Sequence, residues 1–149
     1  MNSRASKSLS LLDIAFTDEV FGLLSRTERE AVLSAGKTKT VEPGEVIYRR
    51  GDQPEGVYVI LSGMVRIATV SNTGEEFILD LSGRGLWIGE LAVLENRQRG
   101  HDAIAETRAT LLFFARIDFE QLLSTWSNFS RAFLHLEARR FRRAAEWAE

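Results

Sequence analysis

The distribution of hydrophobic and polar residues divides the chain into three parts. Apolar residues recur at helical spacing from Leu9 to Gly36, and again from Asp118 to the end of the chain. Between them, short apolar runs alternate with glycine-containing turns. The pattern predicts an N-terminal helical cap over residues 1–36, a β-roll core over 37–116 and C-terminal helices over 117–149, within a single domain.

The N-terminal part carries helix start and stop signals. Ser25-x-x-Glu28 and Thr27-x-x-Glu30 both fit a capping box, in which a hydroxyl and a carboxylate satisfy backbone N–H groups at a helix start. Gly36 is a plausible stop. We interpret these helices as a cap over the β core; a lid or a contact with a partner domain is the alternative.

The middle part has the pattern of short strands and turns that is typical of an all-β unit. The predicted strands are Lys37–Glu42, Glu45–Arg49, Val57–Leu61, Met64–Val70, Glu75–Leu81, Ala103–Ala105 and Thr110–Ala115. Asn72-Thr73-Gly74 is the expected turn of one hairpin. Many short strands separated by glycine-rich turns predict a sandwich or a barrel.

The C-terminal part predicts a short helix over Asp118–Thr125 and a longer one over Ser127–Glu149, which contains no Gly or Pro. The longer helix has two apolar stripes. The first, predicted to pack on the β roll, contains Phe129, Phe133 and Leu136. The second contains Leu134, Ala138, Phe141, Ala145 and Ala148. Its spacing of four, three, four and three is typical of a coiled-coil seam, so it predicts a homodimer. A second core face is the alternative.

The segment Gly85–Thr107 contains the candidate ligand chemistry. Glu90 follows a glycine and precedes a small apolar run, and Arg99 lies nine positions later. A carboxylate accepts hydrogen bonds from hydroxyls, whereas arginine presents a planar fork of donors to phosphate oxygens. Gly89 lets the backbone approach a ligand, and N–H groups at a helix start favour an anion. The alternative is a surface ion pair of little consequence.

The run Gly89–Val93, followed by Arg99-Gly100 and the strand Ala103–Ala105, resembles the phosphate-binding cassette of cyclic-nucleotide-binding domains. The resemblance implies that Glu90 holds the ribose 2′-hydroxyl and that Arg99, rather than Arg97, holds the cyclic phosphate. The full predicted ligand site is Gly89, Glu90, Leu91, Ala92, Arg99, Gly100 and His101.

Glycine turns elsewhere extend the resemblance over most of the chain. Val41-x-x-Gly44-Glu45 and the run from Gly51 to Val65 match further turns of the same family. The family fold is a β jelly roll flanked by helices, so the resemblance implies a mainly β protein with N-terminal helices and a long C-terminal dimerisation helix. The implied effector is cAMP, cGMP or a related small ligand.

The sequence departs from the family pattern at three positions of the cassette. Gly100 lacks a hydroxyl for the phosphate, His101 replaces a small residue, and Asp102 adds negative charge. The resemblance also places Ala144-Ala145 where a threonine and a serine meet adenine in a related regulator. We therefore expect binding of cyclic AMP to be weak or absent.

The segment Glu137–Glu146 resembles the dimerisation helix of CRP/FNR-type bacterial transcription regulators, in which a winged helix-turn-helix follows. The chain stops at Glu149. Our interpretation is an effector-sensing domain truncated before its helix-turn-helix, which signals through the C-terminal helix and contacts DNA only through that absent motif. The alternative is a standalone nucleotide-binding module that acts by protein contact without binding DNA.

Composition excludes several other function classes. The absence of cysteine removes disulfides, zinc–thiolate sites and iron–sulfur clusters. His101 and His135 are the only histidines, too few for a cupin-like metal site, and no nucleophile–base arrangement indicates an enzyme. A net charge of −2 indicates no bulk attraction to nucleic acid or membrane. Without a bilayer-length apolar run or a signal peptide, we expect the cytoplasm and no membrane partner.

Overall fold

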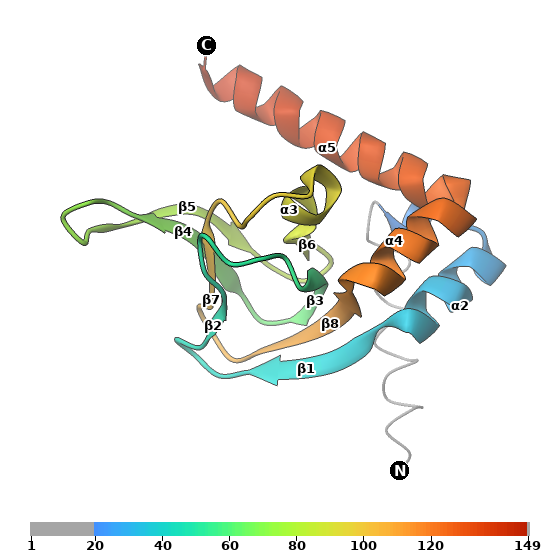
Figure 1. Cartoon of the computed structure of the whole chain (residues 1–149), viewed down its shortest axis with the longest axis horizontal. Helices are drawn as coiled ribbons and strands as arrows, with labels where there is room; N and C mark the ends of the chain where they lie inside the picture. Colours follow the sequence, from blue (N-terminus) through green and yellow to red (C-terminus); the bar gives the residue numbers. More distant parts are fainter. Residues whose placement is uncertain (1–19, 149) are drawn as a thin grey trace.

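A computed structural model describes residues 20–148 and shows two antiparallel four-stranded sheets with helices beside them (Figure 1). One sheet has the order β1 (Lys37–Val41), β8 (Ala109–Ala115), β3 (Gly56–Ser62) and β6 (Trp87–Ile88). The other has the order β2 (Val46–Tyr48), β7 (Asp102–Ala105), β4 (Val65–Val70) and β5 (Glu76–Ser82). The predicted mainly β jelly roll with flanking helices is confirmed.

The helices are η1 (Phe21–Leu23), α2 (Arg26–Ala35), α3 (Glu90–Glu95), α4 (Arg116–Thr125) and α5 (Ser127–Ala148). The capping box of α2 is the one formed by Ser25 and Glu28; Thr27 lies inside the helix, so the alternative box is not used. Gly36 ends α2, and a Cβ there would lie 2.6 Å from Leu112 Cγ. The part of the predicted cap that falls on residues 1–19 lies outside the described residues.

Strand β3 is buried on both faces, which explains its continuous apolar run. Alternate residues of a strand point to opposite faces. Val57 and Val59 accordingly belong to a cluster shared with the helices, whereas Tyr58 and Ile60 belong to a second cluster inside the roll. The sheet that contains β3 therefore separates a core that faces the helices from a core inside the roll.

Helix α5 buries one stripe and exposes the other. Phe129, Phe133 and Leu136 are buried in the helix-facing core, as predicted. In the predicted seam, Leu134 is 72% exposed and Phe141 is 77% exposed. Ala138 and Ala145 are exposed as well, and Ala148 lies outside the residues whose side chains are described. The seam is therefore not a second core face of this chain, and its pairing with another copy stays a prediction.

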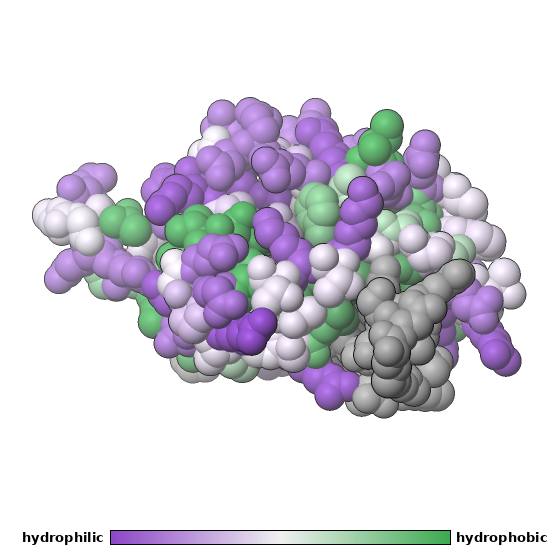
Figure 2. All heavy atoms as spheres, turned by 90° about the horizontal axis from the view of Figure 1, so that it is seen from below, coloured by the Kyte–Doolittle hydropathy of each residue, from purple (hydrophilic) through white to green (hydrophobic). Residues whose placement is uncertain are grey.

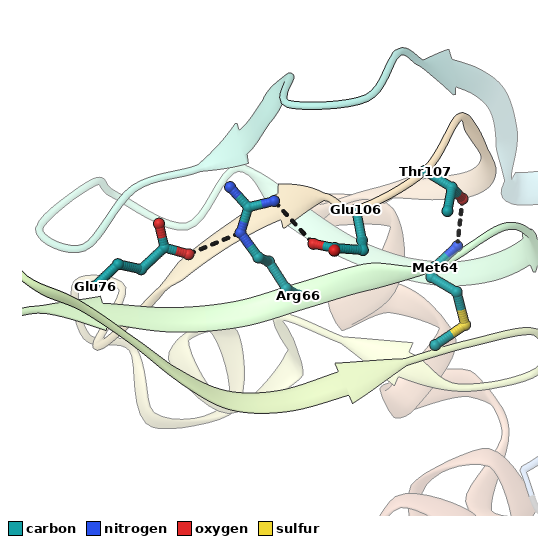
Figure 3. A network of polar contacts seen from close by, with 5 residues as sticks. All are labelled: Met64, Arg66, Glu76, Glu106 and Thr107. Carbon is teal, nitrogen blue, oxygen red and sulfur yellow. Dashed lines mark hydrogen bonds and ion pairs between the residues drawn. The ribbon is translucent and has the colours of Figure 1, made fainter.

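The β4–β5 hairpin projects from the roll (Figure 1). Arg66 of β4 donates to Glu76 of β5 at 2.7 Å and to Glu106, which follows β7, at 3.0 Å (Figure 3). Edge strand β5 nevertheless exposes about half of Phe77 and of Ile78 (51% and 56%). Apolar atoms reach the surface beside this end of the molecule in the view from below (Figure 2).

Candidate functional site

The cassette begins at Gly89, where both the backbone conformation and the contact with Arg99 require a glycine. Gly89 adopts a left-handed conformation, with φ of 83°, immediately before α3. Its carbonyl oxygen accepts a hydrogen bond from Arg99 Nη1. A Cβ at Gly89 would lie 2.8 Å from that same nitrogen. Glycine therefore serves both the turn into α3 and the close approach of the guanidinium.

Arg99 is a buried cation held by neutral groups. Its side chain is 3% exposed, and its Nη2 donates to Gly56 O at 2.6 Å. Its Cζ lies 4.1 Å from the centre of the Tyr48 ring. Among residues 20–148, Arg99 forms no ion pair, and its buried Nε has no hydrogen-bond partner. Burial lowers the pKa of Arg99, because it disfavours the charged form. A buried guanidinium with a spare donor suits an oxyanion.

A cavity of about 350 Å³ opens beside Arg99. Its lining residues are Ile47, Tyr48, Asp52, Gln53, Glu55, Tyr58 and Arg99. Arg97 is exposed, so the structure supports the choice of Arg99 for the cassette position. Burial raises the pKa of Tyr48 to about 12, so this phenol stays neutral and can donate to a ligand.

Glu90 is buried on the other side of the cassette, against α5. Its side chain is 2% exposed, and its Oε1 accepts a hydrogen bond from Arg140 Nη1. Arg140 Nη2 also donates to Trp87 O at 2.7 Å. Figure 1 shows α3 beneath the C-terminal half of α5. Burial raises the pKa of Glu90 to about 8; Arg140 opposes this shift and Glu137 adds to it.

Glu90 and Arg99, which the resemblance assigns to one ligand, do not line a common cavity in this structure. Arg99 lines the cavity, whereas the carboxylate of Glu90 contacts Arg140 instead. Of the remaining predicted site residues, Ala92 of α3 is buried, whereas Leu91, Gly100 and His101 are exposed. Their roles in binding stay predictions.

Asp102 has a structural partner that the sequence did not reveal. Its Oδ1 accepts a hydrogen bond from Arg50 N at 2.7 Å, which ties the turn after β2 to the start of β7. The side chain is buried, and this bond directs its charge toward the backbone of that turn. Electrostatic repulsion of a phosphate by Asp102 is therefore smaller than the sequence suggests.

Sequence reasoning missed three residues at this site. Tyr48 stacks on Arg99, and Arg140 and Glu137 of α5 approach Glu90. Arg140 belongs to a run of arginines on α5, a pattern that is more typical of a solvated helix face. Helical spacing does hold one signal, because Arg140 lies four and seven residues after the buried Leu136 and Phe133, on the side of the helix that faces the roll.

Within residues 20–148, no group of three or more His, Cys, Asp or Glu side chains could hold a metal ion. In the same range, no helix combines the length and apolar character that crossing a membrane requires.

The family model of the cyclic nucleotide-binding domain matches residues 38–125. The chain belongs to the cyclic nucleotide-binding domain family. The match covers the roll, the cassette and α4, so the family relationship rests on the region that contains Glu90 and Arg99.

Relatives of this cyclic nucleotide-binding domain include regulators from bacteria and eukaryotes. The cyclic AMP receptor protein of Thermus thermophilus is 30% identical over 84% of this chain and 58% of that protein. The crystal structure of Thermus thermophilus catabolite activator protein matches with a TM-score of 0.80 and 28% identity, over 88% of this chain and 62% of that one. The regulatory domain of Toxoplasma gondii PKA, co-crystallised with cAMP, matches with a TM-score of 0.72 and 25% identity, over 82% and 46%. The chain therefore spans 58% of the curated receptor that it matches.

Proposed function

We propose that this chain is the effector-sensing domain of a CRP/FNR-type transcription regulator and binds a cyclic nucleotide or a related small ligand. The observation that carries the proposal is Arg99, a buried cation with a spare Nε donor beside a cavity of about 350 Å³. That volume lies within the usual range for small-molecule sites. In this proposal, residues 37–116 hold the effector and residues 117–149 carry the signal. In this proposal the chain catalyses no reaction and acts in the cytoplasm.

Arg140 supports a route from the effector to α5. It occupies the carboxylate of Glu90, which is the group proposed to accept the ribose hydroxyl. An effector that binds Glu90 therefore competes with Arg140 and favours a different position of α5. Such a ligand shifts the population between two positions only by its difference in affinity for them.

The exposed seam of α5 supports a parallel homodimer as the signalling unit. Phe141 is the largest apolar side chain of the seam and is 77% exposed in the single chain. Alanines at Ala138 and Ala145 let two backbones approach closely about a two-fold axis. The dimer would bring the C-terminal halves of two α5 helices together.

Calorimetry with cyclic AMP and cyclic GMP tests the binding proposal. We expect cyclic AMP to bind more weakly than about 1 µM, because Ala144 and Ala145 offer the base no hydrogen bond. Arg99→Ala should weaken binding of either nucleotide by roughly 1.5–3 kcal/mol, the usual loss for a charged hydrogen bond. Arg97→Ala is the matched control, because Arg97 is exposed and should leave affinity unchanged.

Two results would count against the proposal. If neither nucleotide at millimolar concentration gives a heat of binding or raises the unfolding temperature of the chain, nucleotide sensing is rejected. Equal losses in the Arg97 and Arg99 variants would show that binding depends on overall charge rather than on the cassette. Sub-micromolar binding of cyclic AMP would contradict only the expectation of weak affinity.

A further inference from the structure

Two buried carboxylate oxygens, one on α3 and one on α5, form no hydrogen bond among residues 20–148. They are Glu90 Oε2 and Glu137 Oε1. The same nitrogen, Arg140 Nη1, contacts Glu90 Oε1 and lies 3.7 Å from Glu137 Oε1, which brings the two carboxylates close together. Native proteins rarely leave buried polar atoms unsatisfied. Two adjacent acceptors without a donor are both satisfied if one of the carboxylates carries a proton.

The charges around the pair favour the same arrangement. Arg140 donates to Glu90 and lies 3.7 Å from Glu137 Oε1, so one cation serves two acids. The Glu90 side chain is 2% exposed and that of Glu137 is 24% exposed. If both carboxylates were ionised, the second negative charge would cost free energy, because it would have no cation of its own.

Within the described part of the chain, residues 20–148, neighbouring elements supply no further hydrogen-bond partner to these two carboxylate oxygens. Arg99 interacts electrostatically with Glu90, but its Nη atoms donate to the carbonyls of Gly56 and Gly89. Tyr48 of β2 faces the same region and lies against Arg99. A single proton shared by the pair balances the charge of Arg140.

We propose that Glu90 and Glu137 share one proton that joins α3 to α5, and that Glu137 is a positioning residue that controls when Glu90 can accept a hydroxyl of the effector. The shared proton is inferred from the geometry of the cluster, whereas the role of Glu137 in effector binding rests on the proposed function.

The proton balance of binding follows from this arrangement. While α5 is docked, the shared proton lies between the two carboxylates. When an effector hydroxyl donates to Glu90, the contact with Glu137 breaks and the proton passes to solvent. The Glu90 carboxylate is then ionised, and Arg140 remains paired with Glu137. Binding therefore releases one proton below about pH 8 and becomes about tenfold tighter per pH unit as the pH rises toward that value.

Carbon NMR of the glutamate carboxyls tests the shared proton directly. In the wild-type chain, we expect the Glu90 carboxyl to stay protonated at pH 7. In Glu137→Gln, the amide donates to Glu90 and one negative charge is removed, so the midpoint of Glu90 should fall by about one pH unit or more. Glu146→Gln is the matched control, an exposed glutamate on the same helix. A wild-type Glu90 already ionised at pH 6, or a midpoint unaffected by Glu137→Gln, would overturn the shared proton.

Calorimetry with cyclic GMP in phosphate and in Tris at pH 7 tests the link to binding, because the two buffers differ in heat of ionisation. The wild type should release about one proton per nucleotide bound, and Glu137→Gln should release about half a proton or less, because its Glu90 midpoint lies near or below the pH of the experiment. Binding by the wild type without proton release would overturn the role of Glu137. If the wild type binds no cyclic nucleotide, the proposed function fails together with that role, whereas the NMR titration still decides whether the proton is shared.

Discussion

The guanidinium of Arg99 lies against the ring of Tyr48, with 4.1 Å between Cζ and the ring centre. Because this contact uses the ring rather than the hydroxyl, Tyr48→Leu should lower the free energy of unfolding by about 1–2 kcal/mol, whereas Tyr48→Phe should lower it much less. Urea denaturation measures both. Equal losses in the two variants would mean that the hydroxyl, not the ring, supports Arg99.

Gly89→Ala should destabilise the fold more than Gly74→Ala. Both glycines have positive φ, 83° and 87°, so both alanine variants bear the cost of a left-handed residue, about 1 kcal/mol. Only at Gly89 does a Cβ meet another group, 2.8 Å from Arg99 Nη1, whereas Gly74 faces open space. Chemical denaturation compares them. A larger loss at Gly74 would contradict the assigned packing of Arg99 on the cassette turn.

Phe141→Glu should convert a dimer into a monomer, because each carboxylate would face its own copy across the two-fold axis. Phe77→Glu is the matched control: Phe77 is 51% exposed on β5, away from the seam, and its substitution should leave the dimer intact. Sedimentation velocity at micromolar concentration reports both. A wild-type chain that stays monomeric at high micromolar concentration, or a dimer that survives Phe141→Glu, would reject the seam.

Glu90→Gln should remove part of the decrease in folding stability that the wild type shows as the pH rises. Burial raises the pKa of Glu90 in the folded state from 4.5 to about 8, so the folded chain holds a proton that the unfolded chain releases. The resulting stabilisation is fully present below pH 4.5 and is lost as the pH rises through about 8. Thermal unfolding from pH 5 to 9 should therefore show the wild type losing stability relative to Glu90→Gln. A constant difference between the two proteins would show that Glu90 has an ordinary pKa.

The sequence alone determined most of the elements and the position of the cassette, but it did not reveal the two-residue strand β6 (Trp87–Ile88). Helix caps, strand alternation and glycine turns depend on residues a few positions apart, so the capping box at Ser25 and the buried stripe through Phe129 were predictable. The distinction between Arg97 and Arg99 came from the spacing between the arginine and the strand that follows it.

Only the tertiary structure decided what surrounds the two cassette residues. Arg140 is fifty positions from Glu90 in the chain, and Tyr48 is as remote from Arg99. Local spacing records which face of an element is buried, but it contains no record of which distant side chain meets that face. Packing α5 over α3 brought Arg140 and Glu137 to the Glu90 carboxylate, and closing the roll brought Tyr48 to Arg99. Burial at those contacts, rather than residue type, raises the pKa of Glu90. Once a carboxylate is removed from water, the stability of its charged form depends on the few groups packed around it.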